Sequence, residues 1–187
     1  MFKIETHKVK GSAFDFAEQM IKAQGSFKIK GSGSYANVYV DPSKDYVYKM
    51  YSRDYGYDCY LKFLQSQKQQ NPFAPKVYAV RVLKGTDGSR CTVVCTEKLK
   101  PFTTKGQKHK GERMKIFRKA EFLFEKYYQF LYDSDGIYRI KSSKDKLVRL
   151  VEDLYAFYGT KHCGSPDIHK GNLMLRGNQV VITDPLY

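Results

Sequence analysis

The sequence predicts an α+β fold of two lobes, an antiparallel-sheet N-terminal lobe and a mainly helical C-terminal lobe. Alternating apolar and polar residues dominate from residue 27 to about residue 100, as in half-buried strands. Apolar residues then recur at helical spacing, and a short hairpin pattern follows. With 187 residues, 42% of them apolar, the chain is long enough to bury a core. The expected domains are an N-terminal helix over 1–26, a sheet lobe over 27–100 and a helical lobe over 101–187.

The N-terminal lobe is expected to begin with a short helix and to continue with strands. Ser12 and Asp15 form a capping pattern before apolar residues at helical spacing, and Gly25 supplies a stop. The strands that follow are separated by turn residues, and a glycine-rich bend lies inside the first of them. The predicted strands cover 27–40, 45–51, 76–83 and 91–99, with a helix over 57–70 between the second and the third.

The C-terminal lobe is expected to contain two helices and one hairpin. Two short apolar runs flank Gly177 and Asn178, which is typical of a β-hairpin. The hairpin would place Asn172 and Asp184 at its two open ends, side by side. The predicted helices run from residue 112 to about residue 132 and from about residue 144 to residue 158, after a polar linker over 103–111.

The charge balance favours partners that carry acidic or phosphate groups. The chain has 33 Lys and Arg against 19 Asp and Glu, a formal net charge of +14. The segment 105–126 contains eight Lys or Arg and three Glu, a net charge of +5. A solvated helix face is the ordinary interpretation of such a segment, and docking of an acidic protein or a nucleic acid is the alternative.

The remaining composition indicates a reduced cytoplasmic protein. The four cysteines contain no CxxC pair and follow no apolar signal segment, so neither a zinc site nor a disulfide framework is expected. No apolar run approaches the roughly 18 residues that a membrane span needs, so no membrane association is expected.

The glycine bend has the character of a phosphate-binding loop. Gly31 and Gly33 lie between two strand segments, where the backbone can approach a ligand and direct its N–H groups to phosphate oxygens. Ala36 replaces a third glycine, and Val38 follows on the next strand. This strand–turn–strand context differs from the strand–turn–helix of dinucleotide folds. A plain glycine-rich hairpin turn is the competing interpretation.

Lys49 lies in the second strand, with apolar or aromatic neighbours, eleven residues after Val38. This position would bring its ammonium to the α and β phosphates of a nucleotide bound at the bend. The alternative is an outward lysine on an amphipathic strand. A carboxylate from the following helix should hold such a lysine, and Asp54 and Asp58 are available. The partner is left open, with solvated helix charges preferred for both.

Asp167 and Asn172 form a D-x-x-x-x-N pattern, and Asp184 follows the hairpin. A phosphoryl-transfer site needs a carboxylate that orients the attacking hydroxyl and accepts its proton, which suits Asp167. It also needs hard oxygen ligands for Mg²⁺, which suits Asn172 and Asp184. An Asx-rich loop that only fixes turns is the alternative. The ordered set of glycine bend, strand lysine and these three residues favours phosphoryl transfer.

With these motifs the sequence resembles the protein-kinase-like fold, and within it the early Ser/Thr protein kinases of T-seven-type podophages. The matching pieces are FKIKGSGSYANVYV, YVYKMY, PKVYAVRV, CTVVCTEKLKPF, PDIHKGNLM and VVITDP, spread from Phe27 to Pro185. The resemblance implies a minimal bilobal kinase that uses ATP and Mg²⁺. It implies catalytic roles for Asp167, Lys49 and His169, ATP contacts by Gly31, Ser32, Gly33, Ser34, Val38, Lys49, Glu97 and Leu99, and Mg²⁺ binding by Asn172 and Asp184.

The resemblance also implies substrates and a location. The expected substrates are host bacterial proteins, including RNA polymerase and the RNA-processing machinery, in the cytoplasm of the infected cell. His169 occupies the place where ordinary kinases have a lysine that faces the transferred phosphate, so it is either a donor to phosphate or a structural clasp on the loop.

Several family features differ or are expected to be absent. Ser165-Pro166 replaces His-Arg before the catalytic Asp, and Asp184-Pro185-Leu186 replaces Asp-Phe-Gly, so regulation by a Phe flip is not expected. The C-terminal lobe is expected to be truncated, without an activation loop, and a homodimer would cover its exposed edge.

Two other functions remain open. One is a basic pseudokinase that binds and inhibits a host protein or a nucleic acid, for which the retained Lys49 and Asp167 have no use. The other is a small-molecule phosphotransferase, because the DIHKGN sequence also resembles aminoglycoside and choline phosphotransferases. Those enzymes hold cationic substrates in an acidic pocket, and this basic chain is not expected to supply one.

Overall fold

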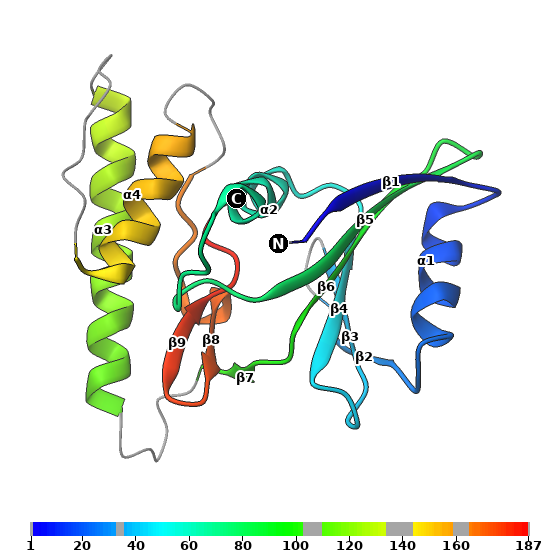
Figure 1. Cartoon of the computed structure of the whole chain (residues 1–187), viewed down its shortest axis with the longest axis horizontal. Coiled ribbons are helices and arrows are strands. Elements are labelled where there is room, and N and C mark those ends of the chain that lie inside the picture. The colour runs from blue at the N-terminus through cyan, green and yellow to red at the C-terminus, as the bar shows by residue number, and fades with distance from the viewer. Residues whose placement is uncertain (1, 33–35, 103–109, 134–143, 159–164, 187) are drawn as a thin grey trace. The chain divides into compact units, whose positions relative to one another are not determined.

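The computed structural model describes residues 2–32, 36–102, 110–133, 144–158 and 165–186. The chain divides into two compact units, which we call unit 1 (Met1–Asp54 and Lys76–Lys98) and unit 2 (Tyr55–Pro75 and Leu99–Tyr187). Unit 1 contains the large sheet and unit 2 contains most of the helices, which confirms the predicted α+β class (Figure 1). Residues 55–75 belong to unit 2, whereas the ranges expected from the sequence kept them in the sheet lobe.

Unit 1 is built on a six-stranded sheet with the order β1-β5-β6-β4-β3-β2. Only the β1–β5 pair is parallel, so the predicted antiparallel character holds for the rest of this sheet. The strands are β1 (Ile4–Val9), β2 (Lys28–Ser32), β3 (Ala36–Val40), β4 (Tyr46–Tyr51), β5 (Val77–Gly85) and β6 (Arg90–Glu97).

Strand β1 was not predicted, since residues 1–26 were expected to contribute only a helix. It lies at the edge of the sheet, and four of its six side chains are exposed. A strand in that position buries too little apolar surface to show a clear alternation of apolar and polar residues.

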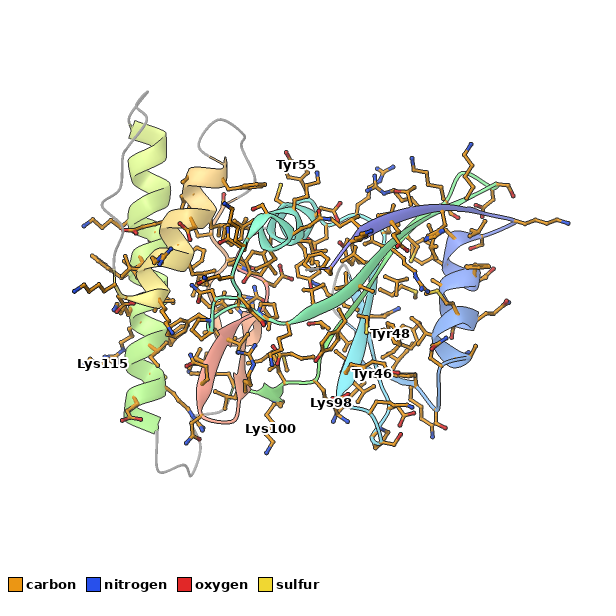
Figure 2. All side chains as sticks on the ribbon, viewed as in Figure 1. Tyr46, Tyr48, Tyr55, Lys98, Lys100 and Lys115 are labelled. Carbon is orange, nitrogen blue, oxygen red and sulfur yellow. The ribbon has the colours of Figure 1, made fainter. Side chains whose placement is uncertain are left out.

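Helix α1 (Ala13–Lys22) packs on this sheet, as its apolar spacing predicted. Its buried residues join Leu83, Val93 and other strand residues in one apolar cluster. The Asp15 N–H donates to Ser12 Oγ at 3.3 Å, so the predicted N-cap is present. Tyr46 and Tyr48 pack beside this cluster on β4, where Figure 2 labels them.

Unit 2 combines helices with a small sheet of order β7-β8-β9. The predicted hairpin is present, and the turn at Gly177 and Asn178 joins its strands. The helix expected over 57–70 ends four residues early, because the sequence after Ser66 offers only polar residues and no apolar face to bury. The elements are α2 (Tyr55–Ser66), β7 (Lys100–Pro101), α3 (Lys110–Asp133), α4 (Lys146–Tyr158), the 3₁₀ helix η1 (Lys170–Asn172), β8 (Leu173–Arg176) and β9 (Gln179–Ile182).

The hairpin β8–β9 is fixed to α2 and to the segment that follows α2. The buried Tyr60 hydroxyl donates to the carbonyl oxygen of Ile182 at 2.9 Å. The Arg176 guanidinium donates to the carbonyl oxygens of Pro72 and Ala74 at 3.1 and 3.0 Å. These contacts explain why residues 55–75 belong to unit 2. In the described parts of the chain, no helix combines the length and the apolar character that crossing a bilayer requires.

Candidate phosphoryl-transfer site

Three residues expected to contact a nucleotide lie in one row across unit 1. Gly31 on β2 pairs with Val38 on β3, and Val38 pairs with Lys49 on β4. Directly paired side chains project from the same face of a sheet, so Val38 and Lys49 share a face beside the Gly31 backbone. A Cβ added at Gly31 would have no heavy atom within 4 Å, so the surface there is open. Gly33 and Ser34 lie outside the described residues, and Ser32 pairs through its backbone with Asn37.

Lys49 has a carboxylate partner. Its Nζ lies 3.7 Å from Asp54 Oδ2, and the two side chains are only 16% and 14% exposed. Its ammonium also lies 5.7 Å from the centre of the Tyr51 ring. The preference for a solvated Asp54 was therefore wrong, because this aspartate immediately precedes α2 and turns back toward β4. The pair is shielded enough to fix the direction of the lysine side chain.

Glu97 and Leu99 lie where β6 ends and β7 begins. Glu97 is 8% exposed, and its Oε1 accepts a hydrogen bond from the Lys76 N–H at 2.7 Å. The Glu97 N–H donates to the Lys76 carbonyl oxygen at 3.0 Å. The Glu97 carboxylate therefore has a structural role, and we expect any contact between this segment and adenine to use the backbone.

In unit 2, Asp167 and Asn172 are brought together by a side-chain hydrogen bond. Asn172 Nδ2 donates to Asp167 Oδ2 and to the Asp167 carbonyl oxygen, both at 2.8 Å. The Asp167 N–H donates to the carbonyl oxygen of Pro185 at 2.8 Å. The loop that carries Asp167 is thus tied at both ends, and its carboxylate, 38% exposed, stays accessible.

His169 acts as a clasp on this loop. Its Nδ1 accepts a hydrogen bond from the Gly171 N–H at 2.9 Å and caps the short helix η1. In a neutral imidazole this bond leaves the proton on Nε2, which lies 3.6 Å from Asp167 Oδ2. Of the two roles considered for His169, the structural one is therefore visible, and its 58% exposed side chain leaves the second available.

At the open end of the β8–β9 hairpin, hydrogen bonds join Asn172 to Thr183, the residue before Asp184. The Thr183 N–H and the Thr183 hydroxyl both donate to the Asn172 carbonyl oxygen, each at 2.9 Å. Asp184 follows directly, and its Oδ1 is shielded from solvent. Burial raises the pKa of Tyr60 far above its usual value, and the nearby charge of Asp184 raises this pKa further. The sequence analysis did not identify Thr183 as a site residue. The one feature that could have indicated it is its position opposite Asn172 in the predicted hairpin, where a hydroxyl could reach the Asn172 backbone.

The oxygen atoms of Asn172 and Asp184 suit Mg²⁺. Because Asn172 Nδ2 donates to Asp167, its Oδ1 is the side-chain atom that could ligate a metal. Asp184 supplies carboxylate oxygens, which Mg²⁺ also prefers. Within the described ranges, no three His, Cys, Asp or Glu side chains form a metal-binding group. A metal held by these two residues would take its other ligands from phosphate and water, as Mg²⁺ commonly does.

The described part of the basic segment 105–126 lies on α3, where both exposed cations and exposed glutamates occur. One of the exposed cations, Lys119, pairs with Asp145. Arg113 is only 5% exposed and donates to Asn178 Oδ1 at 3.0 Å, so it is part of the packing of unit 2. The exposed residues are Lys115, Arg118, Lys119 and Lys126 against Glu112, Glu121 and Glu125, and Figure 2 labels Lys115. Residues 105 and 108 lie outside the described residues.

The chain has similar proteins among solved structures, but none among protein-family models or curated sequences. Among solved structures 46 chains match, including the MAP kinase LmaMPK10 from Leishmania major, with a TM-score of 0.45 and 14% sequence identity. The alignment covers 94% of this chain and 51% of that kinase, so this chain spans about half the length of its match. The assignment of function therefore depends on the motifs and contacts of the chain itself.

Proposed function

We propose that this protein is a Ser/Thr protein kinase that transfers the γ-phosphate of ATP to bacterial host proteins. The observation that carries the proposal is the hydrogen bond between Asp167 and Asn172, in a loop that Thr183 links to the residue before Asp184. This is the arrangement of proton acceptor and metal ligands that phosphoryl transfer to a hydroxyl requires.

Asp167 is the proton acceptor in this mechanism. Its Oδ2 is occupied by Asn172, which fixes the carboxylate and leaves Oδ1 to the substrate hydroxyl. The hydroxyl oxygen bonds to the γ-phosphorus while the bond from that phosphorus to the β-phosphate oxygen breaks. The hydroxyl proton passes to Asp167, and ADP leaves.

Unit 1 supplies the phosphate-binding groups. The Gly31 backbone and the Lys49 ammonium lie on adjacent parts of the sheet, and Asp54 directs the lysine. Asn172 and Asp184 of unit 2 would hold Mg²⁺, which when bound neutralises charge on the β and γ phosphates. His169, whose Nε2 lies 3.6 Å from Asp167 Oδ2, would donate from Nε2 to a phosphate oxygen once the substrate is present.

The test is transfer of labelled γ-phosphate from ATP and Mg²⁺ to bacterial lysate proteins. The native chain is compared with Asp167→Asn and with Asp45→Asn, which changes an exposed aspartate outside the proposed machinery. We expect label on Ser and Thr with the native chain and with Asp45→Asn, and a loss of at least about 100-fold with Asp167→Asn.

Two results would contradict the proposal. Binding of ATP without label from any of the three chains would leave a pseudokinase that acts by binding. Label that appears only on small molecules, and disappears with Asp167→Asn, would instead favour the small-molecule phosphotransferase.

A further inference from the structure

Thr183 joins the two ends of the β8–β9 hairpin through its side chain as well as its backbone. Its N–H and its hydroxyl both donate to the Asn172 carbonyl oxygen, each at 2.9 Å. The preceding residue, Ile182, is anchored in turn, because its carbonyl oxygen accepts the Tyr60 hydroxyl at 2.9 Å. Hydrogen bonds thus hold both Ile182 and Thr183, the two residues that precede Asp184.

Asn172 is held at every polar group except one. Its N–H donates to the His169 carbonyl oxygen at 3.0 Å, and its carbonyl oxygen accepts the two bonds from Thr183. Its Nδ2 donates twice to Asp167. The remaining Oδ1 is the atom assigned to the metal, so its position depends on all of these bonds.

Thr183 has neither of the two proposed chemical roles: it does not accept the proton, and it does not ligate the metal. Its hydroxyl only donates a hydrogen bond to the Asn172 carbonyl oxygen. Removing it leaves the Thr183 N–H bond and the proposed metal ligands in place. Groups that hydrogen-bond to metal ligands commonly set metal affinity by fixing ligand orientation.

We propose that Thr183 is a positioning residue that sets the affinity of the Asn172 and Asp184 oxygens for the nucleotide-bound metal. This inference rests on the proposed function, since it presupposes a metal at these two residues. Without the hydroxyl, the Asn172 carbonyl oxygen accepts one bond from Thr183 instead of two, so the backbone that carries the Asn172 side chain is held less firmly relative to Asp184. The expected effect is weaker metal binding in a protein that is still folded.

The experiment measures metal binding directly in the full chain. Mn²⁺, which accepts the same oxygen ligands, is titrated in the presence of a saturating non-hydrolysable ATP analogue. Relaxation enhancement of water protons reports the ternary complex, and thermal unfolding reports the fold. Thr183→Val removes the hydroxyl at nearly constant shape, and Thr183→Ser restores it. Ser66→Ala is the matched control, because the Ser66 hydroxyl also donates to a carbonyl oxygen, that of Phe63 at 2.7 Å, within α2.

We expect Thr183→Val to weaken Mn²⁺ binding about tenfold, while Thr183→Ser and Ser66→Ala stay within about twofold of the native chain. Equal Mn²⁺ affinity of Thr183→Val and the native chain would overturn the inference and leave the kinase proposal intact. Equal loss with Thr183→Ser would also overturn it, since the hydroxyl would not be responsible. Absence of any ternary complex with the native chain would contradict the proposed function itself. If Thr183→Val does not fold, Thr183→Cys, with its weaker donor, takes its place under the same criteria.

Discussion

At the scale of single residues, the pair of Lys49 and Asp54 gives the first prediction. Asp54→Asn keeps the size of the side chain but removes the charge that lies 3.7 Å from the ammonium. The lysine side chain then loses its fixed direction, and nucleotide binding should weaken. We expect KM for ATP to rise about tenfold, equivalent to about 1.4 kcal/mol, with a smaller change in kcat.

Asp58→Asn is the control for this change, because Asp58 is the other nearby aspartate and lies inside α2. Steady-state kinetics with varied ATP give both constants for each variant. An increase in KM with Asp58→Asn and none with Asp54→Asn would contradict this prediction. It would show that Asp58, and not Asp54, directs the Lys49 side chain.

The residues that could be predicted are those whose spacing is set by the chemistry. Asp167 and Asn172 stand five residues apart because one loop must present both, and the structure joins them by a hydrogen bond. Asp54 and Thr183 could not be assigned in advance. Their roles depend on which way a side chain turns after the chain leaves a strand, and an aspartate or threonine is common at such positions without any ligand.

At the scale of secondary-structure elements, the Lys98 side chain joins the β3–β4 turn to the end of β6. Its Nζ donates to the carbonyl oxygens of residues 41, 42 and 44 at 2.9, 3.2 and 3.0 Å. Lys98→Met keeps the length of the side chain and removes these charged donors. We expect it to lower the free energy of unfolding by about 2 kcal/mol in urea titrations.

Lys100→Met is the matched control, since Lys100 is an exposed lysine two residues away, and Figure 2 labels both lysines. It should change the stability by less than about 0.5 kcal/mol. A Lys98→Met protein as stable as Lys100→Met would show that the turn is held by its own hydrogen bonds, in which Asp41 accepts from Ser26 and Ser43.

Most elements could be predicted because each buries one apolar face. Helix α1 and the β8–β9 hairpin follow that rule closely, and both were placed correctly. Strand β1 contradicts it, since an edge strand gains more from backbone hydrogen bonds than from burial of side chains. Its parallel pairing with β5 is set by residues about 75 positions away and leaves no local signal.

At the scale of the whole molecule, Tyr60 links the stability of unit 2 to alkaline pH. Burial raises the pKa of Tyr60 far above its usual value, so the folded chain keeps this hydroxyl protonated while the unfolded chain ionises near pH 10. The stabilisation is complete below that pH and is lost as the pH rises toward the folded-state pKa. The native chain should therefore lose stability above about pH 10.

Tyr60→Phe should remove part of this loss above pH 10. At neutral pH it should cost about 1–2 kcal/mol, because the Ile182 carbonyl oxygen loses its donor. Urea unfolding followed at pH 7 and above pH 10 measures both effects. The same alkaline loss in both proteins would assign it to the other tyrosines, since Tyr60 is one of sixteen in the chain.

The bond from Tyr60 to Ile182 spans 122 positions in the sequence, and the segment that contains Tyr60 is made long before its partner. During synthesis at about 5–20 residues per second, α2 has to wait about 6–24 seconds for β9 to be made. The contacts that fix α2 to β9 are thus long-range in sequence, and α2 cannot complete its packing before β9 has been made. Until then the apolar side of α2 lacks these partners, so residues 57–63 would offer a binding site to a chaperone that binds apolar segments.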